Sequence, residues 1–133
     1  MNIDHFGVAV RNISLALKEY ELLGFYPIES LYTDKDRNIK IQFIENHQGY
    51  RLELIEVDNI QNQSPINSYI EKSAHSIYHI CYHTNNIEQE IEELRKNGYI
   101  ILSKPDEAIA FHNRRVAFLF HKSIGIIELV EII

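Results

Sequence analysis

Two histidines and two glutamates recur at equivalent positions of this 133-residue chain. His5 and His79 are offset by 74 residues (79 − 5) and lie in the similar segments IDHF and IYHI. Glu53 and Glu128 are offset by 75 residues (128 − 53) and begin the similar segments ELIE and ELVE. Neutral imidazoles and carboxylates together suit a divalent transition metal. The four residues therefore predict one metal site, if the two halves of the chain pair by pseudo-twofold symmetry.

Each of the four side chains belongs to a short apolar segment with the pattern of a strand. Because strand side chains alternate between two faces, His5 shares its face with Gly7 and Ala9, and Glu53 lies between two leucines. A buried carboxylate is costly unless it is paired, hydrogen-bonded or bound to a metal. A single strand histidine is more often an ordinary interior residue, and a single strand glutamate more often faces solvent. Their recurrence favours the metal site, in which an octahedral ion keeps positions open for water or substrate.

The same offsets extend over most of the chain and predict the elements that position these residues. Asn12 and Asn86 precede two helical patterns as N-caps, and Gly24 and Gly98 follow them as C-terminal glycines. In the first half we expect a helix at 13–23 and strands at 3–9, 26–33, 38–46 and 50–57. In the second half we expect a helix at 87–97 and strands at 77–84, 99–103, 114–120 and 125–132.

The sequence therefore predicts an α+β fold of two tandem βαβββ modules within a single domain, 1–133. Module one covers about 1–57 and module two about 76–133. The connection, about 58–75, contains a short helix with a proline in its first turn. The period and copy number do not suit a solenoid, which needs three or more shorter repeats.

Composition limits the classes of partner and compartment. The chain has 13 Lys and Arg against 19 Asp and Glu, and this net charge of −6 argues against a nucleic-acid partner and an anionic membrane surface. No apolar run approaches the ~20 residues that span a bilayer, and the N-terminus lacks the features of a signal peptide, so we expect a cytoplasmic protein. The single cysteine, Cys81, excludes an intrachain disulfide framework and CxxC zinc motifs, which leaves nitrogen and oxygen as the ligand atoms.

Five of the seven histidines lie outside the predicted metal site. His83 shares a strand face with His79 and is a candidate for the lining of a pocket. One further histidine lies in the connection, and three lie at turns or strand ends, where we expect them to face solvent. These four residues are His75, His47, His112 and His121.

The order and spacing of these segments resemble the vicinal oxygen chelate superfamily, which includes glyoxalase I, extradiol dioxygenases, bleomycin-resistance proteins and methylmalonyl-CoA epimerase. The segments that carry the resemblance are IDHFGVAVRNISLALKEY, YRLELIEV, SPINSYIEK, IYHICYHTNNIEQEIEELRKNGY and RRVAFLFHKSIGIIELVE. The likeness is strongest to the methylmalonyl-CoA epimerase and lactoylglutathione lyase-like branch. It implies a cup-shaped, eight-stranded mixed sheet around one divalent ion, with the ligands His5, Glu53, His79 and Glu128.

The resemblance implies a metal-dependent isomerase, epimerase or lyase. The ion, which is zinc, nickel, cobalt or manganese, stabilises the charge that develops when a proton leaves the carbon α to a carbonyl of a small metabolite. Glu53 and Glu128 are the candidate bases that take and return this proton. The expected substrate is a CoA thioester or a glutathione adduct, and the expected assembly is a homodimer. Gln42 stands near the place where some epimerases carry a further glutamate, and an amide cannot act as a general base.

Two other interpretations remain open. A binding or resistance protein of the same fold sequesters a small molecule without catalysis, but such members often lack the ligand set that this chain retains. A degenerate site, in which the four groups are only hydrogen-bonded, would keep the fold without the activity. An extradiol dioxygenase is disfavoured because it typically uses two histidines and one carboxylate, whereas this chain offers four candidates.

Overall fold

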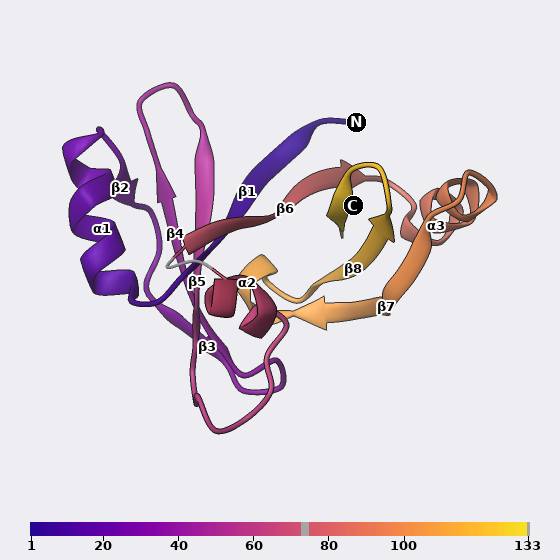
Figure 1. The fold of residues 1–133 in the computed structure, drawn as a ribbon. Coiled ribbons are helices and arrows are strands. Elements are labelled where there is room, and N and C mark those ends of the chain that lie inside the picture. The colour runs from indigo at the N-terminus through magenta and orange to yellow at the C-terminus, as the bar shows by residue number, and fades with distance from the viewer. Residues whose placement is uncertain (73–74, 133) are drawn as a thin grey trace. The chain divides into compact units, whose positions relative to one another are not determined.

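The computed structural model describes residues 1–72 and 75–132, and its contacts divide the chain into two compact units (Figure 1). One unit runs from His5 to Tyr78, and the other combines Met1–Asp4 with the chain from His79 onward. Each unit consists of a β-sheet and helices, so the expected α+β fold class is confirmed. The module boundaries within a single domain stay a prediction.

The unit from His5 to Tyr78 contains strands in the order β2-β4-β5-β1, with β3 also paired to β4. Its strands are β1 (Ile3–Val10), β2 (Tyr26–Pro27), β3 (Tyr32–Asp34), β4 (Ile39–Glu45) and β5 (Arg51–Val57), and its helices are α1 (Ile13–Leu22) and α2 (Asn67–Lys72). Strand β1 lies parallel to β5, and the other pairs are antiparallel. Apart from one strand, these are the elements expected for the first half and the connection, although α2 begins at Asn67, two residues after Pro65, and so does not have the proline in its first turn.

The strand expected at 26–33 is two short strands instead. Strand β2 pairs Pro27 with Ile44, and β3 pairs Tyr32 with Ile41. Five steps along the chain thus match only three steps along β4, so the segment between β2 and β3 leaves the ladder. Pro27 has no N–H to donate, which favours an interruption at this point.

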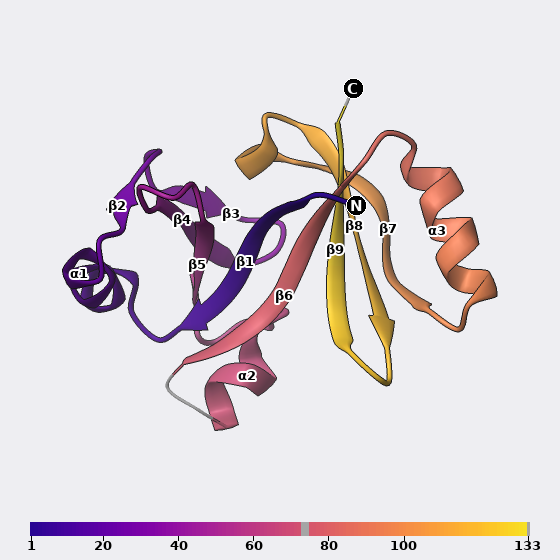
Figure 2. The same cartoon turned by 90° about the horizontal axis from the view of Figure 1, so that it is seen from above.

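The other unit contains strands in the order β6-β9-β8-β7, with α3 alongside them (Figure 2). Its elements are α3 (Ile87–Lys96), β7 (Ile100–Ala108), a 3-10 turn (Ile109–Phe111), β8 (Arg114–His121), β9 (Gly125–Glu131) and β6 (His75–Thr84) from His79 onward. Strand β6 lies parallel to β9, as β1 lies parallel to β5. Strand β7 extends beyond the expected 99–103 because its pairing with β8 continues past two register shifts.

Both longer helices begin and end as the sequence predicts. The side chain of Asn12 accepts a hydrogen bond from the amide of Leu15, and Asn86 accepts one from Gln89. The glycines that follow the helices, Gly24 and Gly98, have φ angles of +93° and +92°, a region that glycine adopts without a Cβ penalty. None of the helices in the described part of the chain has the length and apolar character to cross a bilayer.

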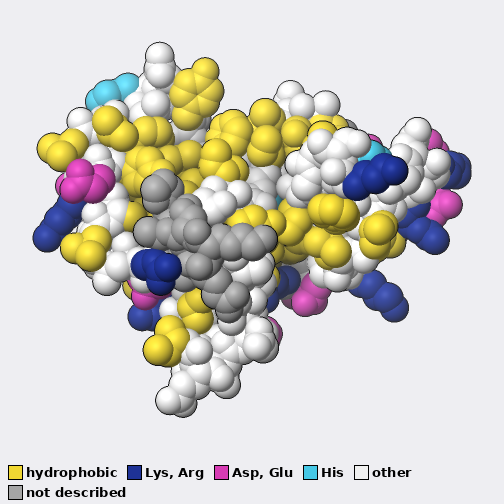
Figure 3. Space-filling model, viewed as in Figure 1, with side chains coloured by type: hydrophobic (Ala, Val, Ile, Leu, Met, Phe, Trp, Pro, Cys, Tyr) yellow, Lys and Arg dark blue, Asp and Glu magenta, His cyan; other side chains and the backbone are white. Residues whose placement is uncertain are grey.

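Helices α1 and α3 both bury an apolar face in the core of their own unit, but they differ in the residues that they expose to solvent. The core under α3 consists of Ile87, Ile91, Ala117, Leu119, Ile127 and Leu129, and the core under α1 consists of Val8, Val10, Ile13, Ile44 and Leu54. On the solvent side, α1 exposes Leu15 and Leu22, whereas α3 has Gln89 and Lys96 at the equivalent positions. Hydrophobic side chains are accordingly visible at the surface over α1 in Figure 3. The buried face has therefore been kept in both repeats while the solvent-facing residues have diverged.

The role of Asn86 as the N-cap of α3 can be tested directly. Replacing Asn86 with Ala removes the acceptor for the Gln89 amide, and we expect the free energy of unfolding to fall by about 1 kcal/mol. Urea denaturation measures the change, with Asn85→Ala at the exposed neighbouring residue as the control. A loss of similar size in both variants would contradict the capping role.

Candidate metal centre

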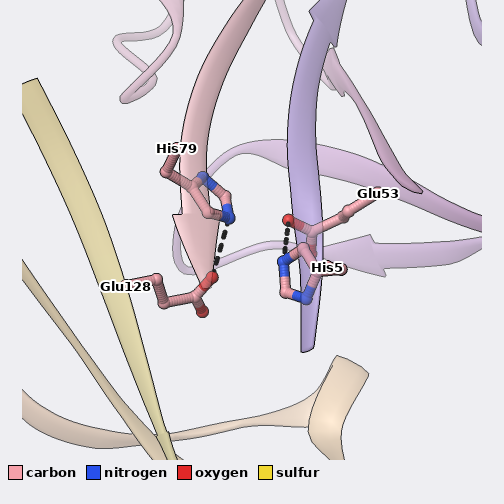
Figure 4. Close-up of side chains that lie close together, drawn as sticks. All are labelled: His5, Glu53, His79 and Glu128. Atoms are coloured by element: carbon pink, nitrogen blue, oxygen red, sulfur yellow. Dashed lines mark ion pairs between the residues drawn. The ribbon is translucent and has the colours of Figure 1, made fainter. Parts of the chain in front are cut away.

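The unit from His5 to Tyr78 brings His5 and Glu53 together (Figure 4). The Nε2 atom of His5 lies 3.4 Å from Oε1 of Glu53. The contact follows from the parallel pairing of β1 with β5, in which Gly7 is the partner of Glu53 and His5 lies two residues earlier on the same face. Both residues are buried, with 1% of His5 and 4% of Glu53 exposed.

The other unit forms the equivalent pair from His79 and Glu128 (Figure 4). The Nε2 atom of His79 lies 2.8 Å from Oε2 of Glu128, and each residue is 2% exposed. Cys81 is the partner of Glu128 in the parallel pairing of β6 with β9, and His79 again lies two residues earlier. The sequence repeat is thus reproduced as the same local geometry in each unit, with cysteine in place of glycine beside the carboxylate.

The chemistry of these two pairs fits a divalent metal. An ionised carboxylate among apolar neighbours is strongly disfavoured unless a partner or an ion compensates it. Each pair supplies one imidazole nitrogen and one carboxylate oxygen, a donor set that suits zinc, nickel, cobalt or manganese. The residues present therefore fit the ion that the sequence predicts. The assignment of all four to one ion stays a prediction.

A second set of equivalent glutamates, Glu56 and Glu131, was left without a role by the sequence analysis. The backbone N–H of Ile13 donates to Oε1 of Glu56 at 2.7 Å, and that of Ile87 donates to Oε1 of Glu131 at 3.1 Å. Each glutamate lies three residues after a proposed ligand and thus on the opposite face of its strand. They bind the first turns of α1 and α3, where unsatisfied N–H groups and the helix dipole favour a carboxylate. The signal that could have indicated this role is the recurrence of a glutamate 43 residues after one helix start (56 − 13) and 44 residues after the other (131 − 87).

In the unit that contains α3, Arg115 on β8 binds both Glu131 on β9 and Glu88 on α3. Its guanidinium donates to Oε2 of Glu131 at 2.8 and 2.9 Å, and it also donates to both carboxylate oxygens of Glu88. These hydrogen bonds hold the pKa of Glu88 below its ordinary value and raise that of Arg115. The equivalent cation in the other unit is Lys40, with Nζ 3.7 Å from Oε2 of Glu56. The strands β5 and β9, which carry the proposed ligands Glu53 and Glu128, are therefore hydrogen-bonded to α1 and α3 through their opposite faces.

The other candidate residues have structural partners. The Nε2 atom of His83 lies 2.6 Å from Oδ1 of Asp4, so this histidine pairs with the N-terminal segment of its own unit. The amide of Gln42 donates to the backbone carbonyls of Glu29 and Phe43 at 2.7 and 3.2 Å. His47 and His112 are exposed as expected, and His121 is half-buried. The side chain of His75 lies outside the described residues.

Comparison with known proteins agrees with this fold. The sequence profile of the glyoxalase/bleomycin resistance protein/dioxygenase superfamily matches residues 4–118. The chain therefore belongs to this superfamily, a vicinal oxygen chelate family. It is 25% identical to an ethylmalonyl-CoA/methylmalonyl-CoA epimerase of Cereibacter sphaeroides, with 98% of this chain and 97% of that protein covered. This relationship supports an epimerase-like function at the level of the family.

Solved structures of related chains have the same fold. A hypothetical protein from Bacillus halodurans is 28% identical, with a TM-score of 0.84 over 99% of this chain and 94% of that one. Methylmalonyl-CoA epimerase from Streptomyces coelicolor, solved with 2-nitronate-propionyl-CoA, is 19% identical, with a TM-score of 0.82 over 98% and 96% of the two chains. The glyoxalase-like fold expected from the sequence is thereby confirmed.

The Arg115–Glu88 contact predicts a change in the titration of Glu88. Replacing Arg115 with Gln removes the donors that lower the pKa of Glu88, so this pKa should rise toward its ordinary value. In the wild type, the contact stabilises the fold above the ordinary carboxyl pKa, and this stabilisation is lost as the pH falls through the lowered pKa of the folded state. NMR titration of the side-chain carboxyl carbons measures the shift. Arg95→Gln, on the same helix as Glu88, is the control, and an unchanged Glu88 titration in Arg115→Gln would contradict the assignment.

The two buried pairs predict coupled effects on stability. In metal-free protein, we expect the double variant His79→Leu with Glu128→Leu to lose less stability than the sum of the single variants, by about 1 kcal/mol or more. The reason is that each single variant removes one partner of a buried polar contact. The same cycle at His5 and Glu53 should give a smaller coupling because that contact is longer. Additive effects in both cycles would exclude a direct interaction.

Proposed function

We propose that this protein is a metal-dependent epimerase that moves a proton at the carbon α to the carbonyl of an acyl-CoA thioester. The observation that carries the proposal is the buried His–Glu pair that occurs in both units at positions related by the sequence repeat. The CoA thioester comes from the relative of Cereibacter sphaeroides, which is named for two such substrates and is similar over nearly its whole length.

The proposed ligands of one divalent ion are His5, Glu53, His79 and Glu128. Two nitrogen and two oxygen donors leave further positions of an octahedral ion for the oxygens of a substrate. The ion, when bound, would supply a Lewis acid that stabilises negative charge on the carbonyl oxygen of the substrate. We also expect a homodimer in the cytoplasm, with zinc, nickel, cobalt or manganese as the ion.

Glu53 and Glu128 are the residues that we expect to handle the proton. Epimerisation removes a proton from one face of a carbon and returns one to the other face, so it needs an acid or base for each face. The repeat supplies one carboxylate from each unit, which suits this requirement. Gln42 does not serve, because an amide accepts no proton at neutral pH and this one is already bound to backbone carbonyls.

The ligand assignment predicts loss of bound metal from two single variants. We expect the purified protein to hold about one divalent ion per chain. His79→Ala and Glu128→Gln should lower this occupancy at least about tenfold while the fold is kept, because each removes a ligand. Elemental analysis after dialysis measures the ion, and circular dichroism reports the fold. Glu93→Gln, an exposed carboxylate on α3, is the control. Full occupancy in both ligand variants would show that the ligands are wrongly assigned.

The reaction itself is tested by exchange of the α-proton of methylmalonyl-CoA for deuterium in D2O, followed by NMR. We expect exchange that a chelator abolishes and added metal restores. Turnover of the methylglyoxal–glutathione adduct instead would contradict the thioester substrate and keep the metal-dependent removal of an α-proton. Tight binding of a CoA thioester without exchange would contradict catalysis and favour a binding protein.

A further inference from the structure

A phenylalanine ring packs against the imidazole of each proposed ligand histidine. The ring centroids of His5 and Phe43 are 5.5 Å apart, with an angle of 81° between the ring planes. The centroids of His79 and Phe118 are 5.3 Å apart, with an angle of 84°. Phe43 and Phe118 are themselves equivalent residues of the repeat, at an offset of 75 (118 − 43). The same edge-to-face contact thus occurs in both units.

Each phenylalanine also lies opposite the glutamate of its pair. Antiparallel pairing joins Phe43 on β4 to Glu53 on β5, and Phe118 on β8 to Glu128 on β9. Directly opposed residues of antiparallel strands share a face and have Cβ atoms about 4.5–5.5 Å apart. Each ring therefore contacts the histidine and borders the carboxylate of the same pair.

We propose that Phe43 and Phe118 are positioning residues that fix the ring orientation of His5 and His79 and thereby set the affinity and geometry of the metal centre. This inference rests on the ligand set proposed above. The ring torsion of histidine is broad, and an aromatic neighbour at a right angle restricts it. A phenyl ring offers no lone pair to an imidazole N–H, so it orients the ring without competing for either nitrogen. An imidazole already aimed at the ion loses less freedom on binding.

Phe118 is the better residue to change. Phe43 is 2% exposed, and the guanidinium carbon of Arg51 lies 6.0 Å from its ring centroid, so its replacement disturbs a further contact. Phe118 is only half-buried, so its replacement removes less buried packing. Phe120 is a matched control because it lies on the same strand and face, is also half-buried, and is opposed by Ile126 rather than by a proposed ligand.

The experiment compares Phe118→Leu, Phe118→Tyr and Phe120→Leu with the wild type. Competition with a chelator gives the Kd for Co2+, and the visible absorption of the Co2+-loaded protein reports the ligand geometry. We expect Phe118→Leu to bind about tenfold more weakly and to change the absorption spectrum. Phe118→Tyr, which keeps the ring, should restore both properties, and Phe120→Leu should leave both unchanged. Urea denaturation of the metal-free proteins separates these effects from a loss of stability.

Four results would overturn the inference. Phe118→Leu with wild-type affinity and spectrum would exclude a positioning role for the ring. An equal loss of affinity in Phe120→Leu, or no rescue by Phe118→Tyr, would reduce the effect to general packing. A wild-type protein that takes up no Co2+ would overturn the proposed metal centre itself. This result is distinguishable from the others because it is obtained with the unaltered protein.

Discussion

Each unit has to bury a carboxylate in the middle of an apolar strand. Glu53 and Glu128 are 4% and 2% exposed, and the cost of removing such a group from water exceeds what one neutral hydrogen bond returns. In each unit, a histidine on the parallel neighbouring strand contacts this carboxylate. The register of the pairing places a small residue, Gly7 or Cys81, directly beside the carboxylate, two residues after the histidine. The same parallel pairing therefore both brings a histidine to the buried carboxylate and sets which side chain lies beside that carboxylate.

The last strand of each unit uses both of its faces. In the segments ELIE and ELVE, the first glutamate faces a histidine and the second, three residues later, faces the start of a helix. An odd spacing in a strand puts the two carboxylates on opposite faces. Glu56 and Glu131 thereby fix the helices at the positions where Asn12 and Asn86 already cap them. One short segment therefore connects the candidate chemistry on one face with the packing of the helix on the other.

Much of this arrangement could be predicted from the sequence because its signals are local or repeated. The caps, the glycines after the helices and the βαβββ order follow from short patterns, and the choice of the two histidines and two glutamates follows from two constant offsets. The split of the strand at 26–33 could not be predicted, because it depends on how far the chain slips against β4. The extension of β7 depends likewise on its pairing with β8. The contact of Arg115 with Glu88 joins a strand to a helix, and no single segment contains the information for it.

The packing of Phe43 and Phe118 against the histidines likewise depends on strand pairing and not on any local sequence pattern. Both rings were visible in the sequence as equivalent residues, but their role depends on the combination of two pairings. The antiparallel neighbour puts each ring opposite a glutamate, and the parallel neighbour puts the histidine within reach of it. Such three-strand relations arise only when the register of both pairings is known. The fold class was therefore accessible from the pattern alone, whereas the surroundings of the candidate ligands were not.

The parallel pairings also have a consequence for the order of folding. The partners Gly7 and Glu53 are 46 residues apart (53 − 7), and Cys81 and Glu128 are 47 residues apart (128 − 81). The hairpins β4–β5 and β8–β9 close over much shorter loops and lose less chain entropy when they form. We therefore expect the hairpin to form first, and the histidine to reach its glutamate when the first strand of the repeat joins that hairpin. During synthesis on the ribosome, all the residues needed for this closure in the first repeat are translated before the second glutamate, Glu128.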